Sequence, residues 1–219
     1  MTKHFLFDFD GTLVDSMPYW ARCMVGVLDN HNVPYEEDII SVITPLGSAG
    51  TIAHFQKMGL NMTAEEISAE IRAVLTPLYR DSIPAKEGVI DCLLALRRAG
   101  HVLHVLTASP HIWLDPCIKR LGIEDVFENI WSSDDFGIGK SNPEIYRMAA
   151  EKIGAAVEDI TFLDDNVNAD KAAKLAGVKV IGVYDDSTKE DEEEMHRVTD
   201  AYVYNFRELE KMLNEDAEY

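Results

Sequence analysis

Two aspartates near the N-terminus, Asp8 and Asp10, have the residue types and spacing for nucleophilic and acid–base chemistry. They follow the apolar run 4–7 and precede the dipeptide Gly11-Thr12. Residues two apart in an extended segment point to the same side, so both carboxylates can face one pocket. Because Asp-Gly is also a common turn dipeptide, a turn with side-chain capping is an alternative explanation of the same pattern.

A hydroxyl group and an ammonium group further along the chain could bind an anion. Thr107 follows the apolar run 101–106, and its hydroxyl could donate to or accept from a phosphoryl oxygen. Ser109-Pro110 is typical of a helix cap followed by proline at the first helical position, which is sufficient to explain Ser109. Lys140 follows a segment with two glycines, which allow a tight fold that could aim the ammonium inward, although lysines are usually solvated.

A third acidic group, Asp164-Asp165-Asn166, follows the apolar run 159–163. Adjacent carboxylates repel each other unless a cation or a helix cap relieves the repulsion. Capping of the next helix by Asp165 or Asn166 is one explanation. The other is a site for a hard cation such as Mg²⁺, which takes oxygen ligands and keeps several waters.

Compact apolar runs predict the strands that position these groups, and they alternate with helical patterns. Such an order predicts a Rossmann-like α/β fold, with a mostly parallel sheet and helices on both faces. Ligands of open parallel sheets bind at the carboxyl ends of the strands, where the acidic pairs and Thr107 are found. The predicted strands are residues 4–7, 101–106, 159–163 and 178–183.

The pattern changes to all-helical spacing after the first strand. An inserted helical cap is therefore predicted at residues 16–83, and the catalytic α/β core at residues 1–15 and 84–219. A helix over 86–98 that Gly100 terminates follows the return to the core. The helices predicted within the insertion are 17–28, 36–43, 49–58 and 64–79.

Composition excludes some classes of function. The 219 residues include 39 acidic and 20 basic side chains, a formal charge of -19, which argues against nucleic-acid binding. Seven of the ten residues at 185–194 are acidic and are expected to form a solvated surface segment. The apolar N-terminal run is too short for a signal peptide or a membrane span, and the three cysteines lack metal-site spacing. A cytoplasmic protein, monomeric or a small homo-oligomer, without a membrane partner is expected.

The chain resembles the haloacid dehalogenase superfamily, whose four motifs match Asp8-Phe9-Asp10-Gly11-Thr12, Thr107, Lys140 and Asp164-Asp165 in the family's order. The resemblance spans nearly the whole chain. The helical insertion is similar to the cap of subfamily I, the branch of phosphoglycolate phosphatases and β-phosphoglucomutases. The resemblance implies a Mg²⁺-dependent phosphatase that acts on a small phosphorylated metabolite.

The resemblance also implies residue roles. Asp8 would form an aspartyl-phosphate, while Asp10 would act as general acid toward the leaving oxygen and then as base toward water. The residues that would hold the phosphoryl oxygens are Thr107, Ala108 and Lys140. The metal ligands would be Asp8, the backbone carbonyl of Asp10, and one or both of Asp164 and Asp165.

Three other functions compete with the phosphatase. A dehalogenase needs neither Asp10 nor the acidic pair. A phosphomutase would share every catalytic residue, but β-phosphoglucomutases tend to have a Lys-Asn pair where this chain has Pro110-His111. A phosphoryl-binding regulatory protein that lacks turnover is the non-enzymatic alternative.

The substrate is expected to meet the helical insertion. Residues 41–56 contain no Asp, Glu, Lys or Arg, and Gly47-Ser48-Ala49-Gly50 is predicted to form a substrate-facing loop. A loop without a cation favours a small, largely neutral leaving group, such as that of a sugar or polyol phosphate. Tyr19 and Trp20 could add apolar contact, although aromatic residues on a helix more often belong to a core.

Overall fold

The computed structural model describes residues 3–215. Six strands form one sheet, and each pair of neighbouring strands is parallel. The strand order is β3-β2-β1-β4-β5-β6, so the first strand of the chain lies between the second and the fourth. The strands are β1 His4–Phe7, β2 Val102–Thr107, β3 Asn129–Ser132, β4 Ile160–Asp164, β5 Lys179–Val183 and β6 Ala201–Val203.

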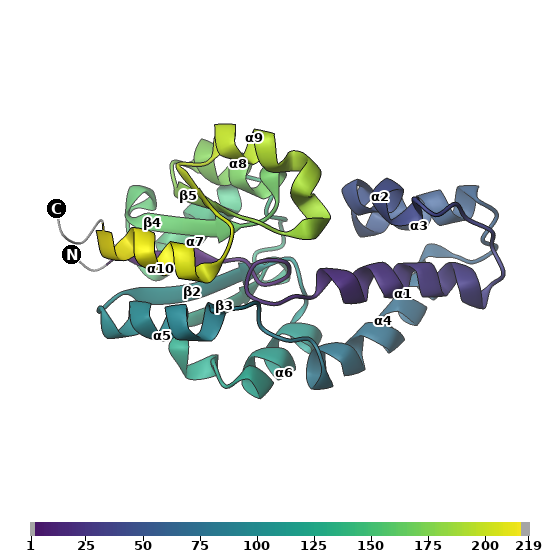
Figure 1. The fold of residues 1–219 in the computed structure, drawn as a ribbon, viewed down its shortest axis with the longest axis horizontal. Coiled ribbons are helices and arrows are strands. Elements are labelled where there is room, and N and C mark those ends of the chain that lie inside the picture. The colour runs from purple at the N-terminus through teal and green to yellow at the C-terminus, as the bar shows by residue number, and fades with distance from the viewer. Residues whose placement is uncertain (1–2, 216–219) are drawn as a thin grey trace. The chain divides into compact units, whose positions relative to one another are not determined.

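Helices cover both faces of this sheet, which confirms the predicted α/β class (Figure 1). One face carries α7 Glu144–Ile153, α8 Val167–Ala176 and α9 Glu192–Val198. The other carries α5 Val89–Arg98, α6 His111–Leu121 and α10 Phe206–Glu215. Single 3₁₀ turns complete the connections: η2 Glu124–Val126, η3 Ser133–Asp135, η4 Val157–Asp159 and η5 Asp186–Asp191.

The alternation of side chains along β1 explains why both faces are covered. Leu6 is fully buried in a core with Phe162 and the inner sides of α7 and α8. Phe7, its neighbour, points to the opposite face, where its ring centroid lies 6.4 Å from that of Phe206 in α10. Each such side chain contributes about 1.5–3 kcal/mol by leaving water. The apolar run therefore fixes β1 at the centre of the sheet.

The chain divides into two compact units: residues 1–15 with 84–219, and residues 16–83. Residues 1–2 and 216–219, which fall within the predicted core boundaries, lie outside the described residues. Every regular element of the second unit is helical. Its elements are α1 Met17–Asn30, α2 Ile39–Ile43, η1 Thr44–Leu46, α3 Gly47–Lys57 and α4 Ala64–Asp81.

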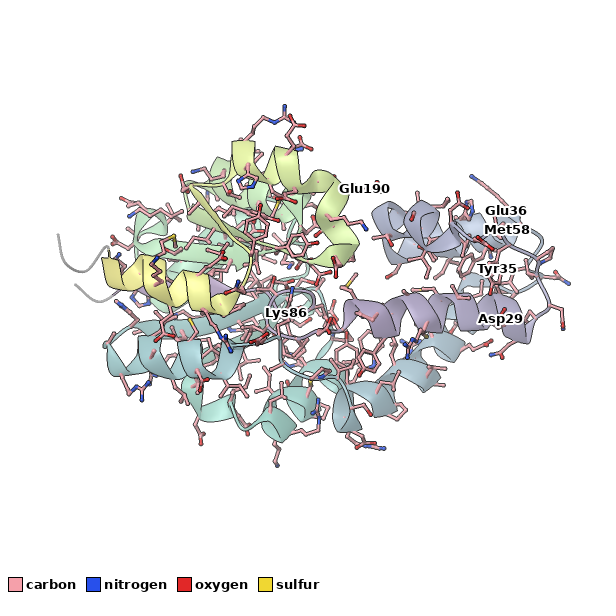
Figure 2. The ribbon with its side chains drawn as sticks, viewed as in Figure 1. Asp29, Tyr35, Glu36, Met58, Lys86 and Glu190 are labelled. Carbon is pink, nitrogen blue, oxygen red and sulfur yellow. The ribbon has the colours of Figure 1, made fainter. Side chains whose placement is uncertain are left out.

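Local sequence explains how this helical unit is built. A capping box begins α4, because the Thr63 hydroxyl accepts from the backbone N–H of Glu66 while the Glu66 carboxylate accepts from that of Thr63. The buried stripe of α4, which includes Ile67 and Leu75, then packs against α1. After α1, Tyr35 donates a 2.9 Å hydrogen bond to Asp29, both labelled in Figure 2, and so fastens the turn.

Some predicted elements differ from the observed ones. The segment 47–50 was expected to be a loop, and this was wrong: it forms the first turn of α3, with Gly47 at a positive φ of 63° where the chain leaves η1. The helix expected from residue 86 begins at Val89, because Gly88 adopts a left-handed conformation with φ 80°. None of the described helices is both long and apolar enough to cross a lipid bilayer.

The segments that leave and re-enter the α/β unit pair with each other. Val14 and Ala85 form an antiparallel bridge. The backbone N–H of Lys86 donates to Leu13 O at 3.0 Å. The backbone N–H of Asp15 donates to Pro84 O, also at 3.0 Å. Residues 13–15 and 84–86 therefore form a short two-stranded ribbon, called the linker ribbon below.

Candidate active site

Asp8 lies directly after the central strand of the sheet. Its backbone N–H donates to Leu163 O of β4 at 2.8 Å, which continues the sheet pairing to this residue. The chain then turns sharply, since the N–H groups of Leu13 and Val14 both donate to Phe9 O. Asp8 is only 5% exposed, so its side chain is largely shielded from solvent.

Asp164 and Asp165 come from β4, the neighbouring strand. One carboxylate oxygen from each of these residues and one from Asp8 lie within 4.8 Å of one another, and all three residues are buried. Burial raises the pKa of Asp164 to about 7 even though Lys140 opposes the shift. Burial and repulsion from Asp164 and Asp8 raise the pKa of Asp165 well above its usual range. A hard cation would relieve this repulsion, and an all-oxygen donor set fits such an ion.

Lys140 reaches this cluster from the connection between β3 and α7. Its Nζ lies 2.5 Å from Asp8 Oδ1 and 2.7 Å from Asp164 Oδ2, and its side chain is only 10% exposed. Burial lowers the pKa of an ammonium, but the two carboxylates overcome that effect and raise it. The Tyr146 hydroxyl donates to Lys140 O at 2.9 Å and fixes the backbone. Lys140 is therefore a largely buried ammonium held between two carboxylates.

The two adjacent aspartates have different partners. Asp164 uses both oxygens, because Oδ2 accepts from Lys140 and Oδ1 accepts from the backbone N–H of Asn166 at 2.7 Å. Asp165 accepts one hydrogen bond from the Thr12 hydroxyl at 2.9 Å. Gly11 makes room for this carboxylate, since a Cβ there would lie 2.5 Å from Asp165 Oδ2. Asp165 is thus held by the loop that follows Asp8.

The cap of α8 is Asn166 rather than Asp165. The Asn166 side-chain oxygen accepts from the backbone N–H groups of Asn168 and Ala169 at 2.9 and 3.3 Å. Capping therefore explains Asn166 but not Asp165. The sequence left both possibilities open.

The Ser109 hydroxyl donates a short hydrogen bond to Asp10 Oδ2. The prediction that Ser109 caps the following helix was wrong, because α6 begins at His111 with Pro110 at the capping position. Thr107, the last residue of β2, is 1% exposed and its hydroxyl accepts from the backbone N–H of Ser109 at 3.1 Å. Ala108, between them, is exposed. The segment 107–109 therefore lies beside β1 and orients Asp10.

The predicted substrate contacts in the helical unit have other surroundings. Gly47 and Ser48 are exposed in the first turn of α3. The Trp20 indole N–H donates to the Tyr79 hydroxyl at 2.7 Å, which fastens α1 to α4.

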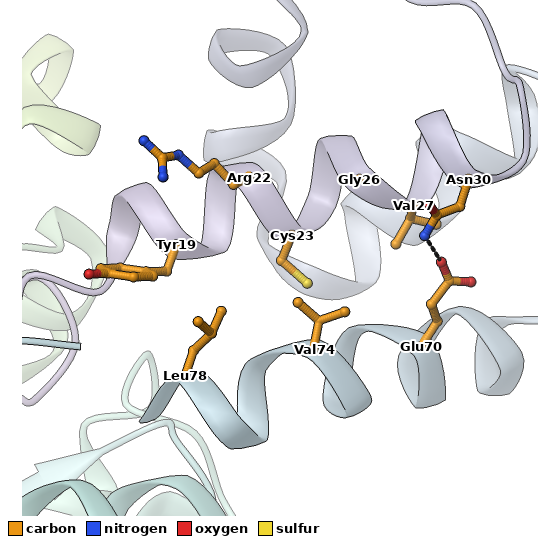
Figure 3. A pocket seen from close by; sticks show the side chains of 9 residues that line it. All are labelled: Tyr19, Arg22, Cys23, Gly26, Val27, Asn30, Glu70, Val74 and Leu78. Atoms are coloured by element: carbon orange, nitrogen blue, oxygen red, sulfur yellow. Dashed lines mark hydrogen bonds between the residues drawn. The ribbon is translucent and has the colours of Figure 1, made fainter. Parts of the chain in front are cut away.

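A pocket of about 230 Å³ between α1 and α4 opens where Gly26 has no side chain (Figure 3). A 2.8 Å hydrogen bond between Asn30 and Glu70 crosses one end of it. It shares no residue with the aspartate cluster. Its lining residues are Tyr19, Arg22, Cys23, Gly26, Val27, Asn30, Glu70, Val74 and Leu78.

Thr12 and Ser109 are contacts of the site that the sequence analysis did not assign to catalysis, phosphate binding or metal binding. Thr12 holds Asp165 and Ser109 holds Asp10. Both are hydroxyl residues close in sequence to a motif residue, and that position is the only signal that could have found them.

Comparison with known proteins is consistent across sequence and structure. The family model described as "Hydrolase: haloacid dehalogenase-like hydrolase" matches residues 2–177. Phosphoglycolate phosphatase of Escherichia coli (strain K12) is 27% identical, over 81% of this chain and 79% of the relative. A phosphatase of Thermotoga maritima named for phosphorylated carbohydrates is 23% identical, over 80% and 82%. CbbY from Rhodobacter sphaeroides, solved with phosphate, matches with a TM-score of 0.79 and 24% identity, over 95% and 96% of the two chains.

Proposed function

We propose that Asp8 attacks phosphorus in a small-molecule phosphomonoester. The premise is that this chain belongs to the haloacid dehalogenase-like hydrolases and is a phosphoric monoester hydrolase. The observation that carries this proposal is the buried Asp8 carboxylate, which lies 2.5 Å from the Lys140 ammonium and beside Asp164 and Asp165. A carboxylate can attack an anionic phosphoryl group only where positive charge offsets the repulsion. Lys140 is the source of such charge within the chain.

The reaction would proceed in two displacements. Asp8 forms a bond to phosphorus as the bond to the leaving oxygen breaks, and Asp10 donates its proton to that oxygen. Asp10 then takes a proton from a water that attacks the aspartyl-phosphate, which releases inorganic phosphate and restores Asp8. The Ser109 hydroxyl supports this role because its hydrogen bond orients the Asp10 carboxyl group.

Phosphate binding is assigned to the chain around the nucleophile. Thr107 and Ala108 lie at the end of β2, the strand that pairs with β1, so they can face the oxygens of a phosphoryl group on Asp8. Lys140 already contacts Asp8 and would share its charge with the same oxygens. Positioning and charge stabilisation supply most of the catalysis in phosphoryl transfer.

The proposed metal is Mg²⁺, and the residues that would hold it are Asp8, the backbone carbonyl of Asp10 and Asp165. When bound, it would neutralise charge on the phosphoryl oxygens. Asp165 is favoured as the direct ligand because Lys140 and the Asn166 backbone already occupy both oxygens of Asp164. Asp164 would then orient Lys140 instead.

The helical unit, residues 16–83, is proposed to act as a cap that selects the substrate, and residues 1–15 with 84–219 as the catalytic unit. Gly47, Ser48 and Trp20 are the proposed cap contacts. The segment 41–56 lacks charged residues other than a histidine. This composition favours a sugar or polyol phosphate, in keeping with the relative named for phosphorylated carbohydrates.

The surroundings of His111 favour a phosphatase over a phosphomutase. Its Nδ1 lies 2.7 Å from Asp115 and its Nε2 lies 2.9 Å from Asp135. The hydrogen bond to Asp115, and to a smaller extent the one to Asp135, raises the pKa of the His111 imidazole. At the position where a mutase would offer a sugar-binding group, His111 instead bridges Asp115 and Asp135.

Hydrolysis of p-nitrophenyl phosphate with and without Mg²⁺ tests the proposal. Asp8→Asn should lower kcat on the order of 10³-fold or more, as expected for loss of a nucleophile, while the exposed control Asp159→Asn keeps wild-type activity. A panel of metabolite phosphates then ranks sugar phosphates against phosphoglycolate. Equal activity of wild type and Asp8→Asn would refute the role of Asp8. Isomerisation of a sugar phosphate without release of phosphate would identify a mutase.

A further inference from the structure

Lys86 carries a partly buried ammonium and lies outside the four motifs. It lies in the α/β unit, where Figure 2 labels it, and its side chain is 20% exposed. Its Nζ donates to Gly11 O at 2.6 Å, to Tyr184 O at 2.7 Å and to Asp185 Oδ2 at 2.9 Å. An ammonium has three donors, so these three acceptors use all of them.

The three acceptors come from distant parts of the chain. Gly11 belongs to the turn after β1, whereas Tyr184 and Asp185 follow β5. Asp185 is itself fixed, because its Oδ1 accepts from the backbone N–H and the hydroxyl of Ser187 at 2.9 and 2.6 Å. It is 5% exposed, although the acidic segment 185–194 was expected to be solvated. Lys86 therefore ties the turn after β1 to a rigid anchor.

The turn that Lys86 holds also contains two residues of the candidate site. Asp10 directly precedes Gly11, and Thr12, which directly follows it, donates to Asp165. Gly11 also packs so closely on Asp165 that no side chain could be added without moving that carboxylate. A shift of the Gly11 carbonyl would consequently move both a catalytic group and a metal-ligating group.

We propose that Lys86 is a positioning residue that fixes the turn 10–12, and through it the orientation of Asp10 and of Asp165 as a metal ligand. The inference rests on the proposed function for both the catalytic role of Asp10 and the metal-binding role of Asp165. Replacing a residue that orients a metal ligand without itself binding the metal typically lowers metal affinity or activity by roughly 10- to 100-fold. Lys86 also belongs to the linker ribbon, whose backbone pairing holds it in place.

The test compares four variants with wild type. Lys86→Met keeps the aliphatic stem and removes the three donors. Because that change leaves Asp185 buried without its cation, the double variant Lys86→Met with Asp185→Asn guards against misfolding. Asp185→Asn alone removes the charge from one of the three acceptors. Lys171→Met is the matched control, since it removes a 2.6 Å ion pair with Glu194 in the same unit.

Two measurements are made on each variant. Binding of Mn²⁺ to the metal-free protein is followed by loss of the free-ion EPR signal, and kcat and KM are measured on p-nitrophenyl phosphate at saturating Mg²⁺. Lys86→Met and the double variant should bind Mn²⁺ roughly tenfold more weakly and lose roughly tenfold in kcat, with KM changed less than about twofold. Asp185→Asn should show a smaller loss of both, and Lys171→Met none.

Wild-type Mn²⁺ affinity and kcat in a folded Lys86→Met or double variant would overturn the proposal. So would a larger loss in Asp185→Asn than in Lys86→Met, because the anchor would then act without the lysine. If wild-type protein hydrolyses no phosphomonoester, the proposed function fails, but the Mn²⁺ comparison still decides the role of Lys86.

Discussion

Asp170 in α8 is fully buried, and neither of its carboxylate oxygens has a hydrogen-bond partner among residues 3–215, the part of the chain that the structure describes. Burial, followed by repulsion from Asp164 and Asp165, raises its pKa to about 10. The group is therefore protonated at neutral pH in the folded, metal-free protein. We predict that Asp170→Asn, which keeps the shape and needs no proton, stabilises that state.

The magnitude follows from the difference between the two pKa values. In the unfolded chain the Asp170 carboxyl loses its proton near its ordinary value of 3.8, so keeping it protonated at pH 7 costs about 4 kcal/mol. Asparagine avoids this cost but buries an amide without acceptors, a loss of about 1 kcal/mol. The net gain of about 3 kcal/mol corresponds to a Tm increase of roughly 6–12 °C in a protein of this size.

The sign of the pH dependence is also fixed. The folded pKa lies above the unfolded one, so the contribution of Asp170 is fully present below pH 3.8 and is lost as pH rises toward about 10. The slope of that loss is about 1.4 kcal/mol per pH unit. Asp170→Asn should therefore be about 1 kcal/mol less stable than wild type below about pH 3.8, match it near about pH 4.5 and exceed it increasingly at pH 7 and above.

Thermal unfolding followed by circular dichroism, with EDTA present, measures this difference across the pH range. The exposed Asp159→Asn is the matched control and should unfold with wild type at every pH. If Asp170→Asn has the wild-type Tm at pH 8 and the same pH slope, Asp170 is ionised in the folded state and the reasoning is refuted.

Substitutions at three further residues test individual contacts and one buried histidine. Ser109→Ala removes the donor to Asp10 and should lower kcat on p-nitrophenyl phosphate roughly tenfold with little change in KM, whereas Ser109→Thr should retain most activity. Tyr146→Phe removes the hydroxyl that donates to the carbonyl oxygens of Lys140 and Ala169, the first contact partly buried and the second buried, and should lower the free energy of unfolding in urea by roughly 1–3 kcal/mol. Burial lowers the pKa of His104 to about 4, so wild type should lose about 3 kcal/mol as pH falls from 6.5 to 4, and His104→Phe should escape that loss in guanidinium titrations.

Each of these expectations has a contrary result. A raised KM with unchanged kcat in Ser109→Ala would place that residue in substrate binding. Unaltered stability of Tyr146→Phe would mean that the carbonyl groups find other donors. An equal acid sensitivity of wild type and His104→Phe would assign the loss to other groups.

The central strands were predictable because burial on both faces demands apolar runs, and the four predicted runs each match an observed strand within one residue at either end. The edge strands β3 and β6 were not. Residues 129–131 of β3 are only partly buried, and β6 has three residues, so neither has a strong apolar pattern. The glycines at 47 and 50 suggested a loop where packing forms a helix.

The site was predictable to the extent that sheet topology determines it. Asp8, Thr107 and Asp164 follow or end neighbouring strands, so the strand order brings them to one edge. The supporting contacts were not predictable. Ser109 and Asp10 are 99 residues apart, as are Lys86 and Asp185, and no local pattern connects such pairs. They depend on loop geometry that forms only after the strands have paired.

The position of β1 has a consequence for synthesis on the ribosome. This strand is made first, yet its neighbours β2 and β4 begin at residues 102 and 160. At about 5–20 residues per second, β1 waits roughly 8–30 seconds for its second partner. The helical unit is complete well before then, so it can fold while the apolar run that precedes Asp8 is still unpaired. All residues of the inserted unit are therefore available for folding before the sheet can close around β1.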